Sequence, residues 1–147
     1  MSAPRPTAAR ERGSSLAEFA IAVTASLTLI MGIVDLGRGL YAYHLISNLA
    51  RLGTRYAIVH GSVCSGCTAS ASTIQTYVRS LAPELGAAAL TVTTTWPPAG
   101  NCGGARAQGP GCPVVVQVAY SFRFAAVPLL PNLTMPISST SQMIISQ

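Results

Sequence analysis

The sequence contains no lysine and has few charged residues of any kind. Only 9% of its 147 residues are charged, and half are hydrophobic. A soluble domain normally carries about 25% charged residues. This scarcity therefore argues for a membrane segment joined to a weakly charged exported part. The absence of lysine also excludes a P-loop, which needs that side chain to hold phosphates.

The net charge of +5 comes entirely from arginines. Proteins that bind nucleic acids gather their basic residues into a patch or stripe. Here the arginines are scattered, and only 6% of the residues are aromatic. We therefore expect no nucleic-acid partner. The basic residues lie at Arg5, Arg10, Arg12, Arg38, Arg51, Arg55, Arg79, Arg106 and Arg123.

The few acids and histidines form no catalytic or metal-binding pattern. Three of the four acids, Glu11, Glu18 and Asp35, lie in the first quarter of the chain, and neither His44 nor His60 has an acid within local reach. No serine lies in a nucleophile elbow. We expect no enzymatic activity, no small-molecule substrate, no cofactor and no metal.

The most prominent feature that is present is an apolar stretch near the N-terminus. No charged residue occurs from Phe19 to Val34, and these 16 residues would span about 24 Å as a helix. The hydrocarbon core of a bilayer is ~30 Å thick, so the helix spans it if Glu18 and Asp35 lie near the two interfaces. We predict one transmembrane helix. A buried core helix is the alternative, which the low charge and the basic flank disfavour.

Residues 1–13 are polar, contain proline and arginine, and show no hydrophobic periodicity. We expect a disordered leader whose net charge of +2 keeps the N-terminus in the cytoplasm and sends the rest of the chain across the membrane. A secretory signal would be cleaved after its apolar part. The small residues Gly13 and Ser14 come before the run, so a cut there leaves the helix on the mature protein.

The helical pattern continues past the membrane to about Val59. Asp35 and Arg38 lie one turn apart on this helix and are placed to form an ion pair. A second helix is predicted at about residues 71–82, beginning with a capping box of Ser72 and Gln75. Alternating side chains then predict three strands. These strands cover residues 90–96, 114–124 and 135–146.

This order of elements predicts an α+β protein with an antiparallel meander. The chain divides into a leader at 1–13, a transmembrane and assembly helix at 14–60, and an exported head domain at 61–147.

Four cysteines, Cys64, Cys67, Cys102 and Cys112, follow the apolar helix. An oxidising compartment makes two disulfides the expected state. Cys102–Cys112 with Cys64–Cys67 is slightly favoured, but a crossed pairing between the two loops is nearly as well supported. A zinc site would need a second close cysteine pair or two histidines, but only His60 lies near Cys64 and Cys67. A thioredoxin-like redox site would need a βαβ context, which the predicted elements do not provide.

The sequence R-E-R-G-S-S-L-A-E-F-A at residues 10–20 resembles the prepilin signal of type IV pilins. The phenylalanine after the glutamate resembles the TadE-type minor pseudopilins of the Tad (Flp) pilus. G-I-V-D-L-G-R-G-L-Y at 32–41 and N-L-A-R-L-G-T-R-Y-A at 48–57 are also similar to the TadE family. One departure is the absence of the proline often found in that family's apolar helix.

The resemblance implies that a prepilin peptidase cuts between Gly13 and Ser14 on the cytoplasmic face. It also implies that Glu18, followed by Phe19, pairs with the free amine of Ser14 of a neighbouring subunit during assembly. A simpler interpretation stays open, because Ser15 and Glu18 also form an S-x-x-E helix cap. The two roles of Glu18 are compatible.

By this resemblance we expect a long N-terminal transmembrane helix continuing into a small pilin-like head with one further helix and a three-stranded antiparallel sheet. The expected function is that of a minor pseudopilin in Tad/Flp pilus assembly, anchored in a bacterial inner membrane. Its expected partners are a prepilin peptidase, other pilin or pseudopilin subunits and the lipid bilayer. The alternative is an uncleaved signal-anchored envelope protein with a disulfide-bonded extracytoplasmic binding domain.

Overall fold

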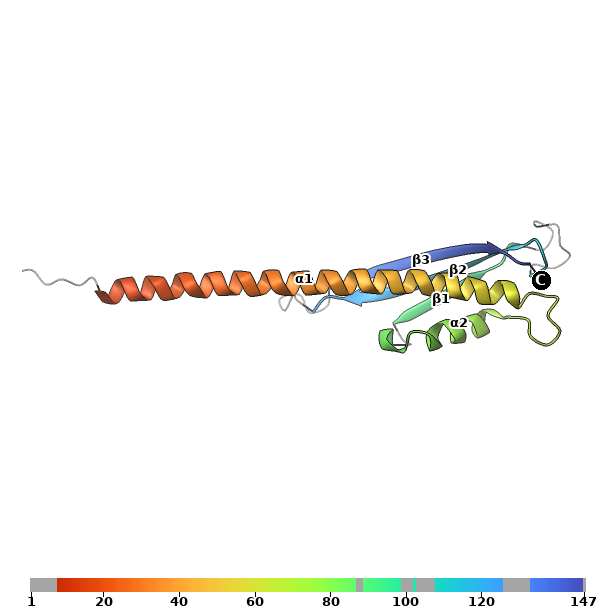
Figure 1. The fold of residues 1–147 in the computed structure, drawn as a ribbon, viewed down its shortest axis with the longest axis horizontal. Coiled ribbons are helices and arrows are strands. Elements are labelled where there is room, and N and C mark those ends of the chain that lie inside the picture. Colours follow the sequence, from red (N-terminus) through yellow and green to blue (C-terminus); the bar gives the residue numbers. More distant parts are fainter. Residues whose placement is uncertain (1–7, 87–88, 99–101, 103–107, 126–132, 147) are drawn as a thin grey trace, which may run out of the picture.

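The computed structural model describes residues 8–86, 89–98, 102, 108–125 and 133–146, with side chains from residue 13 onward. The chain forms one very long helix that carries a small head on its C-terminal half (Figure 1). The expected α+β architecture is confirmed. In chain order the elements are α1 (Ala8–Val59), α2 (Ala71–Ser80), the short 3₁₀ helix η1 (Pro83–Leu85), β1 (Leu90–Thr95), β2 (Pro113–Arg123) and β3 (Thr134–Ile144).

Helix α1 has 52 residues and is therefore about 78 Å long. It ends at Val59, as the sequence predicts. It begins at Ala8, so the expectation that residues 8–13 lack structure is wrong. Alanine, arginine and glutamate are strong helix formers, and extending an existing helix requires no new nucleation. Residues 1–7 of the expected leader lie outside the described residues.

The three strands form an antiparallel sheet in the order β1-β2-β3, which confirms the meander. Val116 of β2 pairs with Thr94 of β1 and with Ser141 of β3. One face of the sheet is covered by α1, which packs against β2 and β3, and by α2, which packs against β1 (Figure 1). The buried side chains of β2 on this face are Val114, Val116, Val118 and Phe122.

The part of α1 that contacts the head is lined mainly by small residues. The larger side chains buried in this seam are Ile46 and Leu49. The other buried residues of the seam, before and after these two, have small side chains or none, which lets the helix axis approach the sheet and α2 closely. These small residues are Ala42, Ala50, Gly53, Thr54 and Ala57.

Helix α2 begins one residue after its cap, Ser70, whose backbone is extended. The Ser70 hydroxyl accepts a hydrogen bond from the backbone N–H of Thr73 at 3.2 Å. The expected cap at Ser72 is therefore wrong. Two serines lie two residues apart here, and the side chain that reaches the exposed N–H groups belongs to the earlier one.

Candidate assembly helix and its junction with the head

The N-terminal half of α1 is apolar and nothing in the described part of the chain covers it. Every residue from 13 to 34 is exposed. Phe19, for example, is 70% exposed and Leu29 67%. Within the described residues, this is the one helix long and apolar enough to cross a membrane. An apolar surface of this size needs a cover, which can be lipid or the helices of other subunits.

The hydroxyl groups in this apolar segment are satisfied within the helix itself. Thr24, Ser26 and Thr28 each donate a hydrogen bond of 2.8 Å to the backbone carbonyl four residues earlier. These internal bonds leave fewer donors that need water, so they suit a helix placed in lipid. Thr24 and Thr28 also line a groove on one face of α1, together with Ala20, Ile21, Ala25, Leu29, Gly32, Ile33 and Leu36.

The residues of the expected cleavage and assembly site lie on the exposed N-terminal turns of α1. Outside its chain neighbours and the backbone of α1, no described atom lies within 4 Å of where a Cβ of Gly13 would be, and Ser14, Glu18 and Phe19 are exposed. Because α1 starts at Ala8, these residues lie inside a helix rather than at its end. In the uncut chain, therefore, Ser15 and Glu18 do not form an N-terminal capping box. Cleavage after Gly13 would return them to the first turn.

Asp35 and Arg38 lie where the apolar half of α1 meets the head, and they form the ion pair that their spacing suggests. Arg38 Nη1 lies 2.8 Å from Asp35 Oδ1, and Asp35 is only 4% exposed. The other carboxylate oxygen, Oδ2, accepts a hydrogen bond of 2.9 Å from the backbone N–H of Ala125, just beyond β2. Asp35 therefore fastens the end of the sheet to the helix.

Phe122 completes this junction. The Arg38 guanidinium carbon lies 5.6 Å from the centre of the Phe122 ring, a cation–π arrangement. The same ring lies 3.9 Å from where a Cβ of Gly39 would be. Sequence reasoning found Asp35 and Arg38 but missed Phe122 and Ala125. No local signal pointed to them, because they lie more than 80 residues away along the chain.

The four cysteines form two pairs in the structure. The sulfur atoms of Cys102 and Cys112 are 2.03 Å apart, a disulfide distance, and Cys64 pairs with Cys67. This arrangement is the first of the two alternatives left open by the sequence. The Cys102–Cys112 pair lies at the end of the head away from the apolar helix, where Gly111 and Cys112 hydrogen-bond to Ile145.

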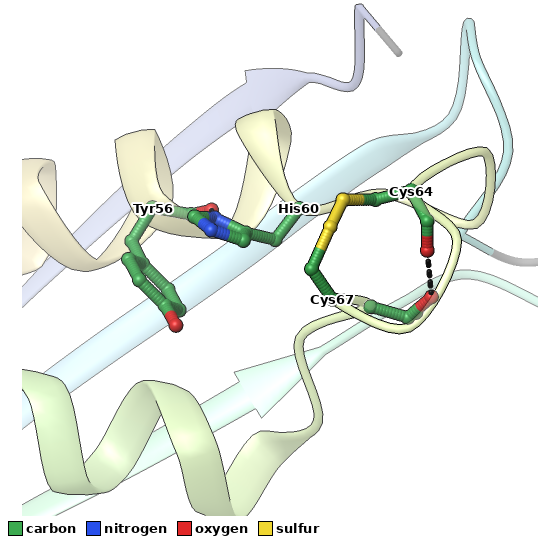
Figure 2. Close-up of a disulfide and its surroundings, with 5 residues drawn as sticks. Tyr56, His60, Cys64 and Cys67 are labelled. Atoms are coloured by element: carbon green, nitrogen blue, oxygen red, sulfur yellow. Dashed lines mark hydrogen bonds between the residues drawn. A yellow bond between two sulfur atoms is a disulfide. The ribbon is translucent and has the colours of Figure 1, made fainter.

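Figure 2 shows the Cys64–Cys67 pair in the loop that follows α1, beside His60 and Tyr56. The rings of Tyr56 and His60 are stacked at 4.2 Å, and Tyr77 of α2 stacks on Tyr56 at 4.5 Å. His60 Nδ1 lies 2.9 Å from the backbone oxygen of Tyr56. The imidazole is therefore part of an aromatic stack that joins α2 to the end of α1.

The family model described as TadE-like protein matches residues 13–55. This match confirms the TadE resemblance over the segment from Gly13 through most of the head-binding half of α1. The TadE-like family is a family of pilus components, and its model covers 43 of the 147 residues of this chain. The comparisons with curated proteins and with solved structures gave no match.

Proposed function

We propose that this chain is a minor pseudopilin of a Tad/Flp-type pilus, anchored in the bacterial inner membrane by α1 with its N-terminus in the cytoplasm and its head outside. In this proposal it is processed by a prepilin peptidase and joins other pilin or pseudopilin subunits through α1. The observation that carries it is the exposed apolar helix, since the TadE-like match covers that same segment. Because none of the described residues covers the apolar half of α1, this half can contact lipid first and other subunits later.

The cleavage step breaks the Gly13–Ser14 peptide bond with one water molecule. It leaves a carboxylate on Gly13 and a free amine on Ser14. In the structure this bond lies within α1, so the first turns must unwind before an aspartyl protease can hold the backbone in an extended form. Glycine assists here, because it is a weak helix former and has no side chain to obstruct the protease.

The mature N-terminus tests this step. We expect Ser14 as the first residue of the protein isolated from cells that contain a prepilin peptidase. Gly13→Ala should abolish that species and leave the longer chain, because the added methyl group strengthens the helix and obstructs the close approach. Mass spectrometry of the intact protein measures both.

The control for this experiment is Gly37→Ala. Gly37 is also exposed on α1 with nothing within 4 Å of its Cβ position, so the substitution should leave cleavage unchanged. A chain that retains its first residues when the peptidase is present would overturn the proposal. It would instead favour an uncleaved signal-anchored envelope protein whose head binds a partner.

Glu18 is proposed to select the neighbouring subunit. After cleavage it lies about one turn from the new amine, on the exposed face of the helix. A carboxylate in the bilayer is costly, by ~2.5–3.5 kcal/mol at the centre and less near an end, unless a positive group offsets it. The amine of Ser14 on a neighbouring subunit is such a group.

We expect Glu18→Ala to be cleaved normally but to lose at least ten-fold in co-purification with other pilus subunits, because the charge that pairs with the amine is gone. Glu18→Gln keeps the shape of the side chain without the charge and should show the same loss. Pull-down of the mature protein with quantitative mass spectrometry measures this. Assembly at the normal level in both variants would remove the charge-pairing role.

A further inference from the structure

The end of β2 lies at a defined position along the axis of α1, which we call its height on the helix. Through the bond from Ala125 to Asp35 and the contact of Phe122 with Gly39, the end of β2 lies beside residues 35–39 of the helix. The uncharged run ends at Val34, immediately before this level. Figure 1 shows that β2 ends, and β3 begins, on the side of the head that faces the apolar half of α1.

If the apolar run crosses a bilayer, with Asp35 near one interface, this height coincides with the lipid headgroup layer. A bilayer is ~40–45 Å thick with its headgroups and has a ~30 Å core, so each headgroup layer is roughly 5–8 Å deep. At 1.5 Å per residue, residues 35–39 rise through about that depth. If the apolar run crosses a membrane, the end of the sheet must therefore lie at the membrane surface.

Most of the larger side chains exposed at this level are apolar or basic, and Ser121 and Thr134 are exposed beside them. We call this surface the proximal tip and define it as Leu36, Arg38 and Leu40 of α1, Arg123 of β2, and Leu133 and Met135 at the start of β3. Leu133 is 44% exposed and Met135 is 46% exposed. Arg123 is exposed. In the register of β2 and β3 it lies opposite Thr134, and its neighbour Phe122 lies opposite Met135.

No exposed acid lies on the stretches that form the proximal tip. Residues 36–43 of α1, residues 119–125 and residues 133–139 contain none, and Asp35 is buried against Arg38 and Ala125. The tip therefore has the composition of a membrane-interface surface, where apolar side chains enter the boundary and arginines meet lipid phosphates.

We propose that the proximal tip is a second membrane-binding surface, which lies in the headgroup layer of the bilayer crossed by α1 and pairs Arg38 and Arg123 with phospholipid phosphates. The inference rests on the membrane anchoring in the proposed function, and not on cleavage or on pilus assembly. Its consequence is that the head is held at two places, so that it cannot rotate freely away from the membrane around α1.

A depth measurement with single tryptophans tests this proposal. The chain has one tryptophan, Trp96, which is replaced in a Trp96→Phe background. Met135→Trp then reports on the proximal tip and Ile144→Trp on the far end of the same strand. Both positions are exposed, and they lie nine residues, or about 30 Å, apart. Leu27→Trp reports whether α1 is in the bilayer.

The full chain is reconstituted into vesicles of phosphatidylcholine and phosphatidylglycerol that carry lipids brominated near the headgroup end of the acyl chain. We expect these lipids to quench Met135→Trp at least two-fold more strongly than Ile144→Trp. We expect Leu27→Trp, near the middle of the apolar run, to be quenched by lipids brominated near the methyl end of the acyl chain. Quenching of Leu27→Trp with equal, weak quenching of the other two would overturn the proposal and leave the membrane anchor intact. If Leu27→Trp is not quenched, the anchor fails and this inference fails with it.

A second copy of the chain is the other possible cover for the proximal tip. Repeating the measurement at a ten-fold lower protein-to-lipid ratio distinguishes a lipid cover from a second copy of the chain, because lipid contact does not depend on protein density. Constant quenching of Met135→Trp supports the proposal. Protection of this tryptophan from acrylamide that disappears on dilution, without quenching by lipid, would assign the tip to a protein interface and overturn it.

The role of the arginines is tested with a charge-matched pair of variants. Arg123→Gln should reduce the quenching of Met135→Trp, and more strongly in vesicles that contain phosphatidylglycerol than in phosphatidylcholine alone, because both lipids carry a phosphate but only phosphatidylglycerol has a net negative charge. Arg55→Gln removes the same charge from an exposed position 20 residues beyond Asp35 on α1, about 30 Å away and outside the Debye length of ~8–10 Å. It should have no effect, and an equal effect of both variants would contradict pairing with phosphates.

Discussion

Gly53 lies where α1 approaches both α2 and the sheet. A Cβ added there would lie 2.8 Å from Cγ2 of Val78 and 3.2 Å from Cγ1 of Val116. Both neighbours are fully buried, so neither has free space to move into. From the sequence this glycine looks like a weak point in a helix, but in the fold it is the residue that permits close packing.

Gly53→Ala should therefore destabilise the head, although alanine is the better helix former. We expect the free energy of unfolding to fall by about 1–3 kcal/mol, the usual cost of overpacking a core. Urea unfolding in detergent micelles, followed by the near-UV circular dichroism of the half-buried Trp96, measures it. Gly37→Ala is the control, because its Cβ position is open, and it should be neutral or slightly stabilising. Equal midpoints for the two variants would contradict the packing role of Gly53.

Asp35 shows what a single residue adds to the site. Its spacing from Arg38 suggested an ion pair within the helix, and the two side chains do lie 2.8 Å apart. No local pattern indicates that the same carboxylate also accepts a hydrogen bond from the backbone N–H of Ala125, 90 residues later. Through this second contact, Asp35 connects α1 to the end of β2 in addition to pairing with Arg38 within the helix.

At the scale of the elements, the predicted second helix is present as α2, but its N-terminal cap is a different serine from the one that the sequence predicts. Helical spacing located α2, whose buried side chains are Ile74 and Val78. The cap was assigned to Ser72 because a glutamine follows three residues later, whereas Ser70 makes the bond. Ser70 has the extended backbone of an N-cap residue, and its hydroxyl is the one that reaches the N–H of Thr73.

Ser70→Ala should destabilise α2 by roughly 0.5–2 kcal/mol, the usual cost of losing an N-terminal cap. The amide of Thr73 loses its acceptor, so its hydrogen exchange should become faster. Exchange measured by mass spectrometry on a peptide that covers the start of α2 reports this. In Ser72→Ala the acceptor remains, and the exchange should stay close to that of the parent. Faster exchange in Ser72→Ala alone would restore the original capping box.

Helix α1 serves two environments along one continuous element. Its first half has exposed apolar residues on all sides, while its second half buries one narrow seam of mostly small residues against the head. Sequence periodicity is a good guide to the strands, where Val114, Val116 and Val118 alternate with outward-facing residues. It is a poorer guide to this seam, because alanine and glycine give little hydrophobic signal even when they are buried.

For the whole molecule, the two cysteine pairs are expected to contribute very differently. Cys102 and Cys112 are ten residues apart and close a loop beside the end of β3, whereas Cys64 and Cys67 are three apart. The entropy that a disulfide removes from the unfolded chain grows with the length of the loop it closes. The longer pair should therefore stabilise the head more than the shorter one, by about 1 kcal/mol in the chain-entropy model.

We predict that Cys102→Ala with Cys112→Ala lowers the free energy of unfolding by roughly 2–4 kcal/mol. Cys64→Ala with Cys67→Ala should cost clearly less. Urea midpoints of the two double variants measure the difference. Peptide mapping of the parent under non-reducing conditions is the accompanying check. A crosslinked peptide that joins the Cys64 loop to the Cys102 loop would show the crossed pairing and contradict this prediction.

The sequence alone determined the parts of this protein that depend on local composition and periodicity. The uncharged run from Phe19 to Val34, the end of α1 at Val59 and the three alternating strands are properties of neighbouring residues, and they emerged without a structure. The TadE resemblance was also visible there, because its motifs are local. These features specify an apolar anchor helix and an antiparallel head.

The tertiary structure decided what depends on residues far apart in the chain. In the fold the end of the sheet lies against Asp35, and Gly53 packs closely against Val78 and Val116. The cap of α2 is Ser70. Contacts of this kind follow from how the sheet packs on the helix, which no single stretch encodes. The height of the head above the apolar run, and with it the position of the proximal tip, is set by this packing.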